Sequence, residues 1–134
     1  MNWKLILQLS MFGLVMGIAT VFVIPSTIEP LFWLVIVVAT AYIIAHREPG
    51  QPFVHGLLTG VANSVWVTAS HVVLFAQYIA RHPQEAAMMS SMPLPDSPRL
   101  MMSLVGPLIG IASGVVIGVL AVLATRMLRR NQSA

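Results

Sequence analysis

Long apolar segments, separated by short breaks that contain proline, make up most of this chain and constrain its fold more than any other feature. Four such segments can be read from the sequence, at about residues 3–24, 31–45, 53–80 and 98–128. A helix needs about 20 apolar residues to cross the hydrocarbon core of a bilayer. The pattern therefore predicts an all-α membrane protein, with a single domain over residues 1–134 that forms a four-transmembrane-helix bundle.

The composition supports a membrane protein over a water-soluble one. The chain is 57% hydrophobic and 8% charged, whereas soluble domains carry about a quarter charged residues. It has no cysteine, which excludes a disulfide framework and thiolate chemistry. The few basic residues lie at the ends of segments, so the high isoelectric point does not indicate a nucleic-acid partner. The expected partner is the lipid bilayer.

The distribution of lysine and arginine predicts the orientation in the membrane. If the N-terminus lies inside, the inner side holds five basic residues: Lys4, Arg47, Arg126, Arg129 and Arg130. The outer side then holds Arg81 and Arg99. Basic residues collect on the cytoplasmic side of membrane proteins, so both termini are expected in the cytoplasm of a cell with a bacterial-type inner membrane. The first segment is expected to stay as an anchor, because no small-residue cleavage motif follows its apolar run.

Glycines recur at every fourth position in the last segment, where each would weaken a helix in water. The regular set is Gly106, Gly110, Gly114 and Gly118. The third segment repeats the spacing with Gly56, Gly60 and Ser64, and the first has Gly13 and Gly17. Small residues let helix backbones approach closely in a bilayer, so the spacing predicts glycine-zipper packing. Packing within the bundle is favoured; the alternative is the seam of a homo-oligomer.

The third segment is the most polar and carries the candidate site. At helical spacing Asn63, Ser64 and His71 share a broad face with Gly56 and Gly60. Polar side chains at bilayer depth turn inward and often mark a pathway or a ligand site. The simpler interpretation, which is favoured, is that they form hydrogen bonds between neighbouring helices.

A methionine-rich loop is expected outside the membrane over residues 81–97. Met88, Met89 and Met92 lie there with His82 nearby, and thioether sulfurs suit Cu(I). The favoured alternative is a short interfacial helix that rests its methionines on lipid or on the mouth of the bundle. The spacing matches no ligand motif, so neither a metal nor another cofactor is predicted.

Catalysis is not expected of this chain. No Ser–His–Asp set, paired carboxylates or HExxH motif occurs in the sequence. All four acidic residues are expected in loops between the apolar segments, so an intramembrane enzyme would lack an evident base or nucleophile.

Three stretches of sequence carry a resemblance to a known group of proteins. They are "MFGLVMG" in the first segment, "QPFVHGLLTG" at the start of the third, and the ending "RMLRR" of the glycine-rich last segment. In these the chain resembles small uncharacterised bacterial four-span inner-membrane proteins. The resemblance implies the same membrane fold, and it implies no activity because that group has none assigned.

The sequence leaves three functions open. The first is a non-catalytic helix-packing protein, as an accessory subunit of a larger membrane complex or as a homo-oligomer. The second is a small transporter or channel that uses the polar face of the third helix. The third is copper handling by the methionine-rich loop. The absence of a carboxylate inside the membrane favours the first, because proton-coupled transport commonly uses one.

Overall fold

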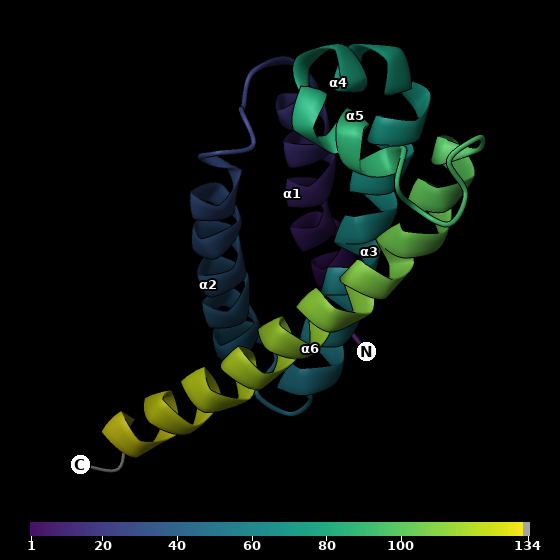
Figure 1. Cartoon of the computed structure of the whole chain (residues 1–134). Helices are drawn as coiled ribbons and strands as arrows, with labels where there is room; N and C mark the ends of the chain where they lie inside the picture. Colours follow the sequence, from purple (N-terminus) through teal and green to yellow (C-terminus); the bar gives the residue numbers. More distant parts are fainter. Residues whose placement is uncertain (133–134) are drawn as a thin grey trace.

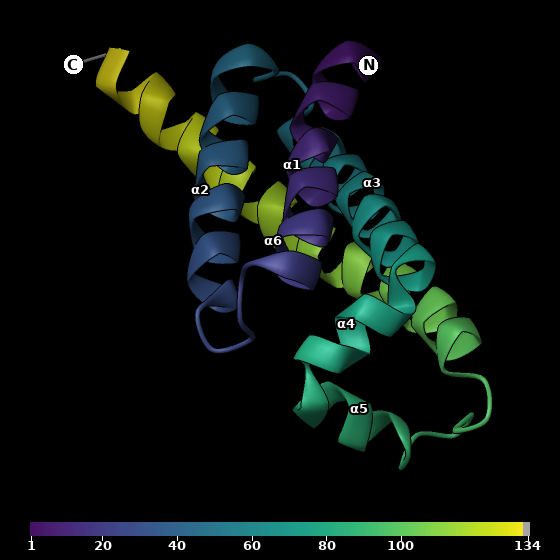
Figure 2. The same ribbon diagram turned by 90° about the horizontal axis from the view of Figure 1, so that it is seen from above.

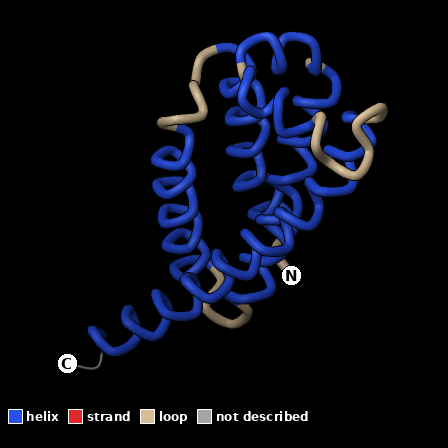
Figure 3. Tube along the Cα trace, viewed as in Figure 1, coloured by secondary structure: helices blue, strands red, loops and turns tan. Residues whose placement is uncertain are grey.

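The computed structural model of the protein describes residues 1–132, and within that range it is all-helical, with no strand (Figures 1 and 3). Its helices are α1 (Trp3–Phe22), α2 (Glu29–Arg47), α3 (Pro52–Val73), α4 (Phe75–Arg81), α5 (Pro83–Met89) and α6 (Pro98–Gln132). The predicted all-α class is confirmed. By length and hydropathy α1, α2 and α6 are each able to cross a membrane, and α3 with α4 makes a fourth candidate if the bent pair is counted as one span.

The third apolar segment is not the continuous helix over residues 53–80 that the sequence predicts. Helix α3 ends at Val73, Leu74 leaves the helical conformation, and α4 continues at 88° to α3. A straight helix over this range would measure about 42 Å, longer than the hydrocarbon core of about 30 Å. The rings of His71 and Tyr78 stack across the bend with centroids 4.2 Å apart. No glycine or proline marks the break in the sequence.

Small residues of α3 and α6 face each other in a regular antiparallel register. Gly56 lies against Gly118, Gly60 against Gly114, Ser64 against Gly110 and Thr68 against Gly106. A β-carbon added to Gly56 would lie 2.5 Å from the Cα of Gly118, and one added to Gly114 would lie 2.5 Å from the carbonyl oxygen of Leu57. The two backbones are therefore in direct contact, which only residues of this size allow.

The glycines of α1 provide the second close contact, against the adjacent face of α3. A β-carbon on Gly13 would lie 2.6 Å from the Cα of Asn63, and one on Gly17 would lie 3.0 Å from the Cα of Val67. Helices α1 and α3 run in the same direction and lie side by side in both ribbon views (Figures 1 and 2). Each of the eight glycines singled out in the sequence thus packs against another helix of the same chain.

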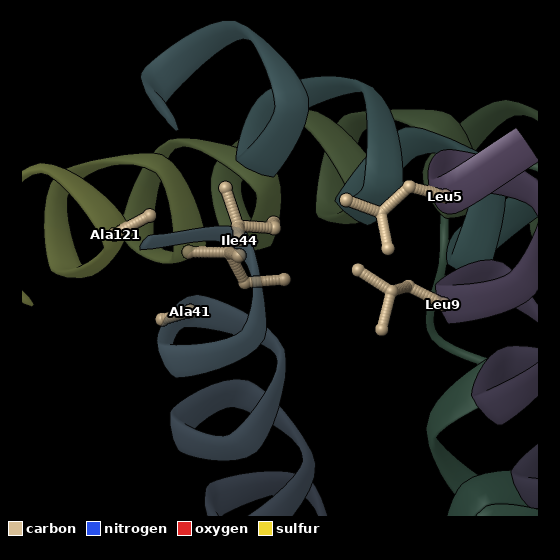
Figure 4. Packing of buried hydrophobic residues seen from close by; sticks show 6 residues of the cluster. Leu5, Leu9, Ala41, Ile44 and Ala121 are labelled. Carbon is tan, nitrogen blue, oxygen red and sulfur yellow. The ribbon is translucent and has the colours of Figure 1, made fainter. Parts of the chain in front are cut away.

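Helix α2 stands apart from α1 over much of its length and meets the rest of the molecule mainly at one end. There Ala41 and Ile44 pack against Ile117 and Ala121 of α6 and against Leu5 and Leu9 of α1 (Figure 4). The side chain of Ile44 is fully buried. We call these six residues the apolar core.

The molecule has two distinct ends. At the end that holds both termini, Arg129 donates a hydrogen bond to the carbonyl of Pro49, and Asn2 donates one to Glu48. At the other end, Ser26 donates a 2.6 Å hydrogen bond to Glu85, and Arg81 donates to the carbonyl of Phe22. We call the first the terminal end. We call residues 75–97, which cover the other end, the lid (Figure 1).

Candidate functional site

A cavity of about 430 Å³ lies between α2, α3 and α6, on the lid side of the apolar core. Pockets for small molecules are commonly about 300–1,000 Å³, so this one has room for a compact ligand. The cavity forms because α2 joins the bundle at the terminal end but diverges from α3 toward the lid. Ile117 belongs both to the apolar core and to the cavity lining, so the core forms the floor.

Two walls of the cavity are largely apolar. Helix α2 contributes Glu29, Trp33, Ile36 and Val37, which fall on one face of a helix at spacings of three and four. Helix α6 contributes mainly Val105, Ile109 and Ile117, with Ser113 among them. The hydroxyl of Ser113 donates to the carbonyl of Gly110 within its own helix. Apart from the carboxylate of Glu29, these two walls therefore offer mainly apolar surface to a ligand.

The α3 wall is polar and uses part of its hydrogen-bonding capacity in helix packing. Its polar lining residues are Asn63, Ser64, Thr68 and His71. The Asn63 Oδ1 accepts a 2.8 Å hydrogen bond from the backbone N–H of Gly13, and the His71 Nε2 lies 2.8 Å from the Thr20 hydroxyl. These bonds join α3 to α1. The contacts therefore support the interpretation of both side chains as links between helices.

The same side chains keep polar atoms that are not used in packing. Among the described residues, no hydrogen-bond partner is found for the Asn63 Nδ2, the His71 Nδ1 or the Thr68 hydroxyl. None of these three atoms is fully enclosed by protein, and their residues line the cavity. The α3 wall can thus donate and accept hydrogen bonds toward a bound molecule while the helix contacts stay intact.

The mouth of the cavity is formed by the lid and the start of α6. Four methionines line it, Met89, Met92, Met101 and Met102. Tyr78 also lines it, and the hydroxyl of Tyr78 has no hydrogen-bond partner within the described chain. Methionine fills irregular apolar space and adapts to neighbours of different shape. A flexible apolar rim therefore surrounds the entrance.

The sequence predicts Glu29 in a loop and does not single out Glu29 or Trp33 as site residues. The structure corrects this, because Glu29 lies in the first turn of α2 and lines the cavity. Its Oε1 accepts a 3.0 Å hydrogen bond from the Trp33 indole N–H one turn later. The signal in the sequence is the spacing of Glu29, Trp33, Ile36 and Val37. In a helix this spacing places a carboxylate, an indole and two aliphatic side chains on one face.

The four residues of the copper alternative are not brought together as a set. Met89 and Met92 line the cavity, whereas Met88 is 56% exposed. His82 is a buried residue of the lid, and its ring stacks on Tyr78 with centroids 4.4 Å apart. No group of three or more His, Cys, Asp or Glu side chains suited to a metal occurs among the described residues. The polar candidates Asn63, Ser64 and His71 do lie together, on one cavity wall.

Comparison with known proteins gave no match, since no family model, curated protein or solved structure is similar to this chain.

Proposed function

We propose that this protein is a four-span inner-membrane protein, with both termini in the cytoplasm, that binds a small amphipathic molecule in the cavity as a transporter-like protein without catalysing its conversion. In this proposal α1, α2, α3 and α6 cross the membrane, glycine-zipper packing joins α3 to α1 and α6, and the lid lies on the outer side. The supporting observation is a cavity with one polar wall that has free hydrogen-bonding atoms, facing two apolar walls.

The shape of the cavity favours a binding protein over an open channel. A channel needs a continuous polar path, whereas the apolar core closes the cavity toward the terminal end with the buried side chains of Ile44 and Ile117. The lid is tied to the turn between α1 and α2 by the Ser26–Glu85 hydrogen bond. A ligand would thus reach the cavity from the lid end or from the bilayer.

A second candidate is the accessory subunit or homo-oligomer. It is favoured by α2, whose outward side chains Leu31, Leu34, Val35 and Val38 are 55–67% exposed. The glycine faces do not add to this case, because they are occupied within the chain. Native mass spectrometry in mild detergent distinguishes this second candidate from the ligand-binding protein. We expect a monomer; a stable dimer or higher assembly would support the second candidate.

The binding function is tested by filling the cavity. The protein is placed in lipid nanodiscs and titrated with the uncharged fluorescent probe N-phenyl-1-naphthylamine, with empty nanodiscs subtracted. Val105→Trp places a large ring in the cavity and is expected to abolish specific binding. Leu104→Trp is the matched control, because Leu104 is 54% exposed and does not line the cavity. Equal binding by the two variants, or none by the parent protein, would contradict the proposal.

A further inference from the structure

We propose that the ligand is a lipophilic organic cation, that is, a tertiary or quaternary ammonium or a phosphonium that carries apolar groups. The inference deepens the proposed function and rests on it. Its positive group would lie at Glu29, Trp33 and Tyr78 near the mouth. Its apolar part would lie between α2 and α6.

The charge of the cavity lining carries the first step. Of the described residues that line the cavity, Glu29 alone has a formal charge, and it is half-buried. An anionic ligand would place a second negative charge beside this half-buried carboxylate, which is unfavourable. A cation would gain a charge partner there, so the site selects by the sign of the charge.

The carboxylate of Glu29 is not neutralised by the protein itself. No salt bridge to Glu29 is found within the described residues. The two arginines at this end of the molecule make other contacts: Arg81 donates to the Phe22 carbonyl, and the Arg99 guanidinium lies 5.3 Å from the centroid of the Phe75 ring. The Trp33 indole N–H holds one oxygen of Glu29. The other oxygen has no hydrogen-bond partner in the described part of the chain.

The side chains around Glu29 suit a cation with apolar substituents. Trp33 and Tyr78 both line the cavity. An aromatic face such as that of Trp33 attracts cations, most strongly where water is excluded. The faces of the Tyr78 ring are covered by His71 and His82, so Tyr78 would contact the cation through its hydroxyl. The four methionines of the rim supply polarisable, flexible contacts. Beyond them the walls are aliphatic, with Ile36, Val37, Val105 and Ile109. A small hydrated cation would gain nothing from those walls, whereas a lipophilic cation would bury its substituents there.

Two probes of almost the same shape and opposite charge test the inference. Tetraphenylphosphonium and tetraphenylborate are each dialysed against the protein in nanodiscs, with empty nanodiscs subtracted for membrane uptake. We expect saturable binding of tetraphenylphosphonium at least about tenfold tighter than that of tetraphenylborate, the scale of one favourable charge contact. Tetraphenylborate binding as tightly as tetraphenylphosphonium would overturn the inference.

The Glu29→Gln variant assigns the selectivity to one side chain. Glutamine keeps an oxygen that can accept from Trp33, so the local fold is expected to hold, and a melting curve checks this. Tetraphenylphosphonium affinity should fall about tenfold, whereas the affinity for the uncharged probe N-phenyl-1-naphthylamine should fall much less, because that probe gains no charge contact at Glu29. Asp96→Asn is the control, because it removes the same charge from an exposed position at the same end. An equal loss in both variants would contradict the assignment.

The uncharged probe also separates the two proposals. If it binds in a way that Val105→Trp abolishes, but tetraphenylphosphonium shows no preference over tetraphenylborate, only the cation inference fails. If neither the uncharged probe nor tetraphenylphosphonium binds saturably, the cavity is not a ligand site and both proposals fail.

Discussion

The side-chain amide of Asn63 contributes its oxygen to helix packing and leaves its nitrogen available to the cavity. Its oxygen accepts the N–H of Gly13 at 2.8 Å, and its nitrogen has no partner in the described chain. His71 is similar, with Nε2 on the Thr20 hydroxyl and Nδ1 unused. Packing and ligand binding are therefore not alternatives at these residues. A variant of either residue should affect stability as well as binding.

The hydrogen bond between His71 and Thr20 should appear as a coupling in stability. We expect His71→Ala and Thr20→Val each to lower the free energy of unfolding. A double-mutant cycle should give a coupling of about 0.6 kcal/mol and at most about 1.7 kcal/mol, the mean and the maximum found for hydrogen bonds between membrane helices. Denaturant titration in mild detergent provides the measurement. Additive losses, with coupling below about 0.3 kcal/mol, would show that the two side chains do not stabilise the contact between α1 and α3.

The polar residues of α3 stand out in the sequence as site candidates, whereas Glu29 does so only once the first turn of α2 is known to begin there. Asn63, Ser64 and His71 stand out because they interrupt an apolar segment. Glu29 follows a proline-bounded turn and has the composition of a loop. It reaches the cavity because the first turn of α2 begins there and because α2 diverges from α3. That divergence depends on tertiary packing, which no local pattern records.

The register between α3 and α6 makes a specific prediction about the small-residue contact. A methyl group at Gly114 would meet the backbone of Leu57, whereas one at Gly110 would meet chiefly the side chain of Ser64. We expect Gly110→Ala and Gly114→Ala each to cost about 1–3 kcal/mol, the usual range for overpacking. Adding Ser64→Gly should recover much of the loss at Gly110 and none at Gly114.

Thermal unfolding in detergent measures these losses, with Val116→Leu as the control at a position that is 51% exposed. A recovery by Ser64→Gly that is equal for both alanine variants would contradict the register. So would a loss in Val116→Leu as large as those at the glycines.

The hydropathy of the sequence predicts where the helices lie, but it does not predict the break in the third segment. The ends of α1, α2 and α6 fall within a few residues of the predicted ones, because prolines and polar turns bound the apolar runs. The bend at Leu74 has no such marker. It is accompanied by the hydrogen bond from Arg81 to Phe22, which is distant in sequence, and by the ring stack of His71, Tyr78 and His82. Contacts of this kind are not encoded in the periodicity of one segment.

At the scale of the whole molecule, charge and architecture agree. The turn between α2 and α3 lies beside both termini through the Arg129–Pro49 and Asn2–Glu48 hydrogen bonds. Lys4, Arg47 and Arg129 therefore lie toward the terminal end, while Arg81 and Arg99 lie at the lid. Basic residues collect on the cytoplasmic side of membrane proteins. The larger number of basic residues at the terminal end is therefore what we expect if that end faces the cytoplasm.

The absence of native cysteine makes this orientation directly testable, because each introduced thiol is the only one in the chain. Gly50→Cys and Asn131→Cys mark the terminal end, and Ser91→Cys marks the lid; all three positions are exposed. In intact cells a membrane-impermeant maleimide should label Ser91→Cys alone. After the cells are opened it should label all three, which confirms that the thiols react. Labelling of Gly50→Cys and Ser91→Cys from the same side of the membrane would exclude the four-span topology. Labelling of Gly50→Cys and Asn131→Cys alone in intact cells would keep the four spans but reverse their orientation.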